Sequence, residues 1–128
     1  MKWILAVTLL LVSGLGFAQY KSVSPTEEKK NIVVLNKRVA TTKVAFNKAP
    51  KNAQAKKAYV DANVALGLQY TYSQTVDRKV KYKLALKYLR EALKYDPKNK
   101  DARQMHDQIV SIYKSMGRPV PGDGDSKS

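Results

Sequence analysis

Apolar residues recur at helical spacing along most of the chain, and the first such stripe begins after residue 25. Its members lie at intervals of three, four and seven residues, with Thr42 in the missing position: Ile32, Leu35, Val39 and Phe46. Ser24-Pro25-Thr26-Glu27 is a start signal, because serine caps a helix, proline suits its first turn and glutamate completes a capping box. With Pro50 as a stop signal, the pattern predicts a helix from residue 25 to about residue 47.

Three further helices are predicted over about residues 52–72, 78–95 and 99–116. The helix at 52–72 is rich in alanine, which lets a neighbouring helix approach closely. The helix at 78–95 is apolar over more than half its circumference, so we expect it to lie between two neighbours: Val80, Leu84, Ala85, Tyr88, Leu89, Ala92 and Leu93. The helix at 99–116 has one apolar side, as expected of the last helix in an array: Ala102, Met105, Ile109, Ile112, Tyr113 and Met116.

The first 18 residues have the three regions of a secretory signal peptide. Lys2 supplies a positive start, residues 4–12 form an uncharged apolar run, and Gly16 and Ala18 are small residues at positions −3 and −1 of a cleavage site. An uncleaved membrane anchor is the alternative, but residues 3–18 fall short of the roughly 20 that span a bilayer. We therefore expect cleavage after Ala18 and an exported, periplasmic or secreted protein.

The remaining chain divides into a lead-in at residues 19–24, a helical domain at 25–116 and a tail at 117–128. The tail (GRPVPGDGDSKS) has Val120 as its single large apolar residue and is rich in glycine, proline and serine. Such a composition predicts disorder. Because no segment shows the period-two pattern of a strand, the sequence predicts an all-α bundle of about four antiparallel helices.

A repeat-like pattern covers residues 58–97. The stretch KYKLALKYLREALKYDP at residues 81–97 has small residues where another helix would cross, and Leu66-Gly67 and Tyr70 upstream have the spacing L-G-x-x-Y. These residues resemble the tetratricopeptide repeat, a helix–turn–helix unit of 34 residues. The resemblance implies about one and a half degenerate repeats and, as a habit of the family, binding of a protein or peptide. The positions that match its packing pattern are Leu66, Gly67, Tyr70, Ala85, Tyr88, Leu89, Ala92 and Pro97.

The connection at residues 71–81 departs from this family, because it is about six residues longer than the family's tight turn. Either the helix before it is extended, or the loop at residues 73–77 bulges outward. Tyr72 and Tyr82 flank this loop, so we expect them to be exposed and to contact a peptide partner. The other tyrosines of these two helices are expected to pack inside the repeat.

Charge is the strongest signal in the composition, with 24 Lys and Arg against 10 Asp and Glu and a formal charge of +14. Lys83, Lys87, Arg90 and Lys94 form a basic strip along the helix at 78–95. The strip is either a solvated face or a surface for a polyanion such as lipid headgroups, polysaccharide or an acidic protein. Nucleic acid ranks last among these partners, because base stacking needs exposed aromatic residues among the basic ones and an exported chain does not meet the genome.

Groups that carry catalysis or bind metals are scarce in this sequence. There is no cysteine, and His106 is the single histidine. It has no histidine or glutamate three or four residues further along its helix, and we expect the adjacent Asp107 to point elsewhere. No glycine-rich phosphate loop is present. We therefore expect no catalytic site, no metal and no cofactor.

Three hypotheses of function follow. The first is an exported, non-enzymatic, tetratricopeptide-like module that binds a protein in the cell envelope and has no membrane span after cleavage. The second is a binder of anionic surfaces through the basic strip. The third is a small enzyme, for which the usual catalytic groups are missing.

Cleavage after Ala18 can be measured directly. Mass spectrometry of the exported protein should give an N-terminus at Gln19, and Ala18→Leu should leave the precursor uncleaved because signal peptidase requires a small residue there. Exported protein that still begins at Met1 would contradict the prediction.

Overall fold

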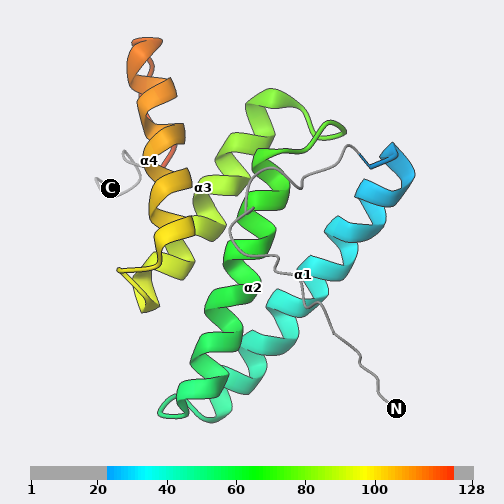
Figure 1. The fold of residues 1–128 in the computed structure, drawn as a ribbon, viewed down its shortest axis with the longest axis vertical. Helices are drawn as coiled ribbons and strands as arrows, with labels where there is room; N and C mark the ends of the chain where they lie inside the picture. Colours follow the sequence, from blue (N-terminus) through cyan, green and yellow to red (C-terminus); the bar gives the residue numbers. More distant parts are fainter. Residues whose placement is uncertain (1–22, 123–128) are drawn as a thin grey trace, which may run out of the picture.

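The computed structural model describes residues 23–122, which form four α-helices and no strand (Figure 1). The helices are α1 (Pro25–Lys48), α2 (Ala53–Thr71), α3 (Arg78–Tyr95) and α4 (Lys100–Ser115). These bounds agree with the predicted helices to within about one residue at each end, and the all-α fold is confirmed. The predicted signal peptide and residues 123–128 of the predicted tail lie outside the described residues.

Each helix begins at a side chain that caps it. The capping residues are Ser24, Asn52, Asp77 and Asn99, and the side-chain oxygen of each accepts a hydrogen bond from a backbone N–H of the first turn. The donor–acceptor distances lie between 2.8 and 3.2 Å. Because these N–H groups have no partner within the helix, such caps fix where each helix starts.

α2 is the central helix, and it packs against α1, α3 and α4. Its buried residues point in all directions: Tyr59, Val60, Ala62, Asn63, Val64, Leu66, Gly67, Tyr70 and Thr71. The expectation that α3 lies between two neighbours is confirmed, but the most enclosed helix is α2. α3 does contact both α2 and α4, but Val80, predicted to lie in its apolar contact, is 47% exposed.

α2 and α3 approach each other closely at Gly67. A Cβ atom placed there would lie 2.8 Å from Cγ and Cδ2 of Leu89 and 3.4 Å from the carbonyl oxygen of Ala85. Ala85 and Ala92 are fully buried on the facing side of α3. Small residues on both helices therefore set the distance between them, as their pattern predicted.

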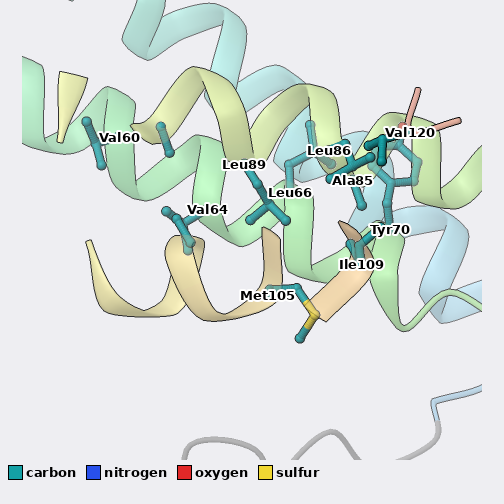
Figure 2. Packing of buried hydrophobic residues seen from close by; sticks show 12 residues of the cluster. Val60, Val64, Leu66, Tyr70, Ala85, Leu86, Leu89, Met105, Ile109 and Val120 are labelled. Atoms are coloured by element: carbon teal, nitrogen blue, oxygen red, sulfur yellow. The ribbon is translucent and has the colours of Figure 1, made fainter. Parts of the chain in front are cut away.

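The main core lies between α2, α3 and α4 (Figure 2). Leu66 and Leu89 fill its centre without exposed surface, and Met105 and Ile109 cover it from α4. Ile32, Leu35 and Val39 of α1 pack against its edge, as the first apolar stripe predicted.

A second, aromatic contact joins α1, α2 and α3. The rings of Phe46, Tyr59 and Tyr95 lie with centroids 5.1 to 5.9 Å apart. The Tyr59 hydroxyl donates a hydrogen bond of 2.9 Å to the Glu91 carboxylate. Burial, together with this bond to a carboxylate, raises the pKa of Tyr59 to about 12, so the ring stays a neutral donor at any physiological pH.

The prediction of a disordered tail is wrong for residues 117–122, here called the C-terminal segment. Gly117 adopts a positive φ of 65° and ends α4. The backbone N–H of Arg118 then donates to the Tyr113 carbonyl at 3.0 Å, and Val120 is buried in the core (Figure 2). The composition of the segment did not predict this order. A single valine can hold a short segment in place when the helices already present an apolar surface for it to bury.

Gly67→Ala is expected to lower the free energy of unfolding by about 1–3 kcal/mol, because the added methyl would overlap Leu89 and push the helices apart. The effect opposes helix propensity, which favours alanine over glycine by about 1 kcal/mol. Urea unfolding followed by circular dichroism measures it. Ala58→Gly, on the exposed side of α2, is the control and should cost no more than propensity. A Gly67→Ala protein as stable as the original would contradict the close contact.

Candidate functional site

The loop between α2 and α3 neither extends α2 nor bulges outward, so both alternatives from the sequence are wrong. α2 ends at Thr71, and the loop folds back against the start of α1. Ser73 is only 1% exposed. Its hydroxyl accepts hydrogen bonds from the backbone N–H groups of Thr75 and Val76, at 3.3 and 3.0 Å. Lys81 of α3 donates to the Ser73 carbonyl at 2.8 Å.

The carboxylate of Glu28 holds this loop. It accepts hydrogen bonds from the Ser73 hydroxyl, from the backbone N–H of Gln74 at 3.1 Å and from the Thr75 hydroxyl at 2.9 Å. Glu28 is 4% exposed although it lies in the first turn of α1. Burial by itself raises the pKa of Glu28, but these hydrogen bonds outweigh burial, and the pKa lies below its ordinary value.

The basic strip of the sequence analysis is divided in the structure. Lys83, Lys87 and Lys94 are exposed, whereas Arg90 is half-buried and donates from Nη1 to the Pro121 carbonyl. Two of the lysines also lie along aromatic rings, with Nζ of Lys87 5.3 Å from the ring centre of Tyr88 and Nζ of Lys94 5.4 Å from that of Tyr95. Arg90 therefore holds the C-terminal segment, and the exposed part of the strip is three lysines.

A hollow of about 620 Å³ lies between α3 and the C-terminal segment. We call it the α3–tail hollow. Val80 and Leu84 supply apolar side chains, Lys83 and Lys87 supply cations, and Pro121 closes it from the segment. Because Val80 is 47% exposed, the hollow offers both an apolar contact and positive charge.

A second hollow of about 600 Å³ lies between the first turns of α3 and the last turn of α4, and we call it the α3–α4 groove. Ile112 and Met116 are 36% and 51% exposed in it. Its other lining residues are Asp77, Arg78, Lys79, Tyr82, Tyr113 and Arg118. Asp77 accepts a hydrogen bond from the backbone N–H of Lys79 at 2.8 Å, so it serves as the cap of α3.

The charged side chains that line the two hollows are mainly positive. Their cations, apart from the Arg90 already described, form what we call the basic face: Arg78, Lys79, Lys83, Lys87 and Arg118. Apolar side chains that α2 does not cover lie between these cations. A surface of this kind favours a partner that is both acidic and apolar.

Of the two tyrosines predicted to be exposed, Tyr82 lines the α3–α4 groove and Tyr72 lines neither hollow. Tyr72 caps the end of α2 and is 39% exposed. Tyr82 is half-buried, and Nζ of Lys81 lies 5.2 Å from its ring centre. The prediction of exposure is therefore confirmed for Tyr72 and wrong for Tyr82, whose ring packs partly against the core.

The residues expected to pack as a repeat mostly lie in the interior. Tyr70 stacks on Tyr88 with ring centres 5.8 Å apart, and its hydroxyl accepts a hydrogen bond from Asn36 of α1 at 3.3 Å. Pro97 is exposed in the turn between α3 and α4. The others are buried: Leu66, Gly67, Ala85, Leu89 and Ala92.

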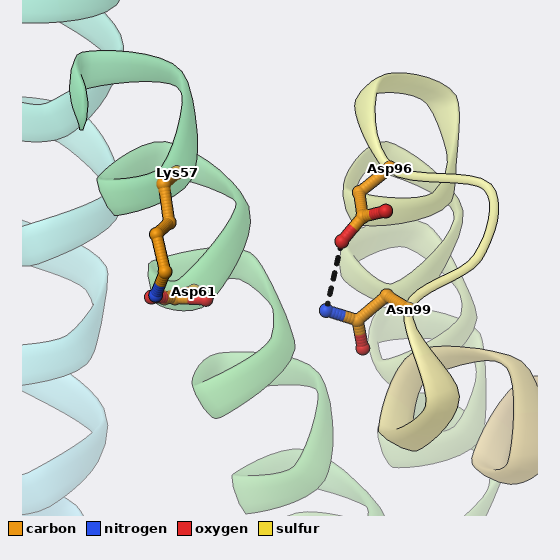
Figure 3. Close-up of polar contacts among 4 residues, drawn as sticks. All are labelled: Lys57, Asp61, Asp96 and Asn99. Atoms are coloured by element: carbon orange, nitrogen blue, oxygen red, sulfur yellow. Dashed lines mark hydrogen bonds and ion pairs between the residues drawn. The ribbon is translucent and has the colours of Figure 1, made fainter. Parts of the chain in front are cut away.

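A third hollow, of about 450 Å³, lies between α2 and the turn before α4. Figure 3 shows four of the charged and polar residues that line it. Its charged and polar groups pair with one another. Lys57 and Asp61 form an ion pair of 2.7 Å, and the Asn99 amide donates to Asp96 at 3.3 Å. Because these groups already satisfy one another, this hollow favours an external ligand less than the basic face does.

His106 lies half-buried on α4, and its Nδ1 is 2.9 Å from a carboxylate oxygen of Asp107. The expectation that Asp107 points elsewhere is therefore wrong, because neighbouring side chains on a helix can still meet when both turn sideways. Among residues 23–122, no group of three or more histidine and acidic side chains is placed to hold a metal ion.

Comparisons with known proteins identify no relative of this chain. No family model, no curated protein and no solved structure matches it. In the part of the chain that the structure describes, no helix combines the length and the apolar character that crossing a bilayer requires.

The Glu28 contact predicts a specific dependence of stability on pH. A carboxyl whose pKa is lower in the folded protein than in the unfolded chain, where it is about 4.3, stabilises the fold above that value. This stabilisation is lost as the pH falls through the lower, folded pKa. Urea unfolding between pH 7 and pH 2.5 should show this loss, and Glu28→Gln should remove that part of the pH dependence.

At pH 7, Glu28→Gln should also cost about 2–4 kcal/mol, because it leaves buried donors without their charged acceptor. Glu27→Gln, at the exposed neighbouring position, is the matched control and should cost less than about 1 kcal/mol. Equal stability of the two variants would contradict the role of Glu28.

Proposed function

We propose that this protein is an exported, non-enzymatic helical module that binds an acidic protein partner in the cell envelope. The observation that carries the proposal is the basic face, where cations of α3 and the C-terminal segment line the same hollows as the exposed Val80, Ile112 and Met116. Export is inferred from the signal-peptide pattern of residues 1–18.

A repeat-like arrangement of the helices supports this role. α2 and α3 pair through Gly67, Ala85 and Leu89, and α4 packs against both of them. Stacked helices that each contact their neighbours are typical of helical repeats, whose extended surfaces bind proteins. We propose the likeness to the tetratricopeptide repeat at this level of packing.

The chemistry of the described residues supports a role without catalysis. His106 is half-buried and pairs with Asp107. Glu28 holds a loop, and Asp77 caps a helix. These groups are engaged in stabilising the fold, which leaves the basic face as the surface offered to a partner.

Binding of an anionic surface through charge alone is the second candidate, and the exposure of Lys83, Lys87 and Lys94 on one helix favours it. The two functions differ in their dependence on salt. The screening length falls from about 8 Å at 0.15 M to about 3 Å at 1 M salt, which weakens contacts between exposed charges but not apolar packing.

The two candidates are separated by reversing the three exposed lysines, as Lys83→Glu, Lys87→Glu and Lys94→Glu together. Arg90 is left unchanged, because it holds the C-terminal segment. The tagged full chain is produced in the organism that encodes it and is purified through its tag. The partner protein recovered with it is quantified at 0.15 M and 1 M salt. A partner docked by apolar contact should stay bound at 1 M salt and lose no more than a few-fold on reversal.

The matched control reverses three exposed lysines of α1, as Lys37→Glu, Lys43→Glu and Lys48→Glu. It should leave recovery unchanged. Complete loss of binding both at 1 M salt and on reversal of the α3 lysines would favour the electrostatic function. Recovery of no protein above an untagged control at either salt would overturn the proposed function.

A further inference from the structure

The apolar stripe of α4 is longer than the core that covers it. Ala102, Met105 and Ile109 are no more than 2% exposed, because α2 and α3 lie over them. Ile112 and Met116 continue the same stripe at helical spacing but are 36% and 51% exposed. The last turn of α4 therefore presents an apolar surface that the described residues of the chain leave uncovered.

This surface forms one wall of the α3–α4 groove, and Tyr82 of α3 lines it as well. Its volume of about 600 Å³ lies within the range of about 300–1,000 Å³ that is typical of binding pockets. Met116 adds adaptability, because the flexible methionine side chain adjusts to the shape of a partner. The groove thus has the size and composition of a docking site for apolar side chains.

The charges around the groove select its occupant. Arg78 and Lys79 lie at the start of α3, and Arg118 follows α4. A second copy of this chain would bring an equal set of cations onto the same place in a symmetric dimer, and each copy has a formal charge of +14. An acidic segment would instead neutralise the rim.

The spacing of the groove residues favours a helical segment. Ile112 and Met116 are four residues apart, about 6 Å along α4. A helix laid alongside would place side chains at positions i and i+4 against them, with the remaining positions free to carry acids toward the rim.

We propose that the α3–α4 groove binds an acidic amphipathic helix of the partner protein, with apolar anchors at i and i+4 against Ile112 and Met116 and with Asp or Glu facing Arg78, Lys79 and Arg118. The inference rests on the proposed function in that the partner is a protein.

A designed peptide tests the proposal without knowledge of the partner. The probe is a labelled 15-residue peptide, blocked at both ends, with Leu at positions i, i+4 and i+8, Glu beside each Leu and Ala elsewhere. Its binding to the full exported chain is measured by fluorescence anisotropy at 0.15 M salt. A peptide of the same composition with its leucines spread around the helix should bind at least tenfold more weakly.

Two variants locate the binding in the groove. Ile112→Glu with Met116→Glu should weaken binding at least tenfold, whereas Val33→Glu with Val34→Glu, at two exposed valines of α1, should change it less than twofold. Arg78→Glu with Lys79→Glu, at exposed positions that do not disturb the core, should weaken binding of the acidic peptide and strengthen binding of a version with Lys in place of Glu.

Four results would overturn the inference. Equal binding of the spread-leucine peptide would mean that charge alone binds it, and equal loss from the α1 variant would place the site elsewhere. Binding to vesicles rich in phosphatidylserine through Ile112 and Met116, without binding of the peptide, would make a membrane the occupant. If the peptide fails while the partner is still recovered from cells at 1 M salt, the inference fails and the proposed function stands.

Discussion

The close approach of α2 and α3 at Gly67 is the contact on which the rest of the structure depends. Leu89 occupies the space that a side chain at this position would take, so the two helices pack at a short distance. This pairing makes α2 the central helix and directs the opposite side of α3 outward. The exposed Lys83, Lys87 and Val80 lie on that outward side and line the α3–tail hollow, so this part of the candidate site is a consequence of how the core packs.

Glu28 adds a second constraint, because it links the start of α1 to the loop between α2 and α3. Its carboxylate joins the first turn of α1 to a loop about 45 residues later in the chain, at Ser73 and Thr75. The loop leads directly into α3, so this contact also fixes where the first turn of α3 begins. Arg78 and Lys79, which line the α3–α4 groove, are the first two residues of α3 after this loop.

The candidate site lies where the apolar pattern of the helices extends beyond their core. Val80 of α3, Ile112 of α4 and Met116, which follows α4, belong to apolar stripes, yet they are between 36% and 51% exposed. The C-terminal segment covers part of the available surface with Val120, and Arg90 holds it there. The apolar surface that remains exposed is lined by cations as well, and this combination of charge and apolar area is the basis on which we propose an acidic partner.

The sequence by itself determined the four helices and the Ser24 cap, because each depends on neighbours within a few residues along the chain. It also showed the small residues through which α2 and α3 pack, because their pattern follows the helical period. It also placed Lys83, Lys87 and Lys94 on the surface, where the structure has them. Only the tertiary structure decided the burial of Glu28, the use of Arg90 to hold Pro121, the placement of Val120 in the core and the exposure of Ile112 and Met116. Each of these depends on a partner that is distant in sequence or on where another helix ends, and neither composition nor periodicity carries that information.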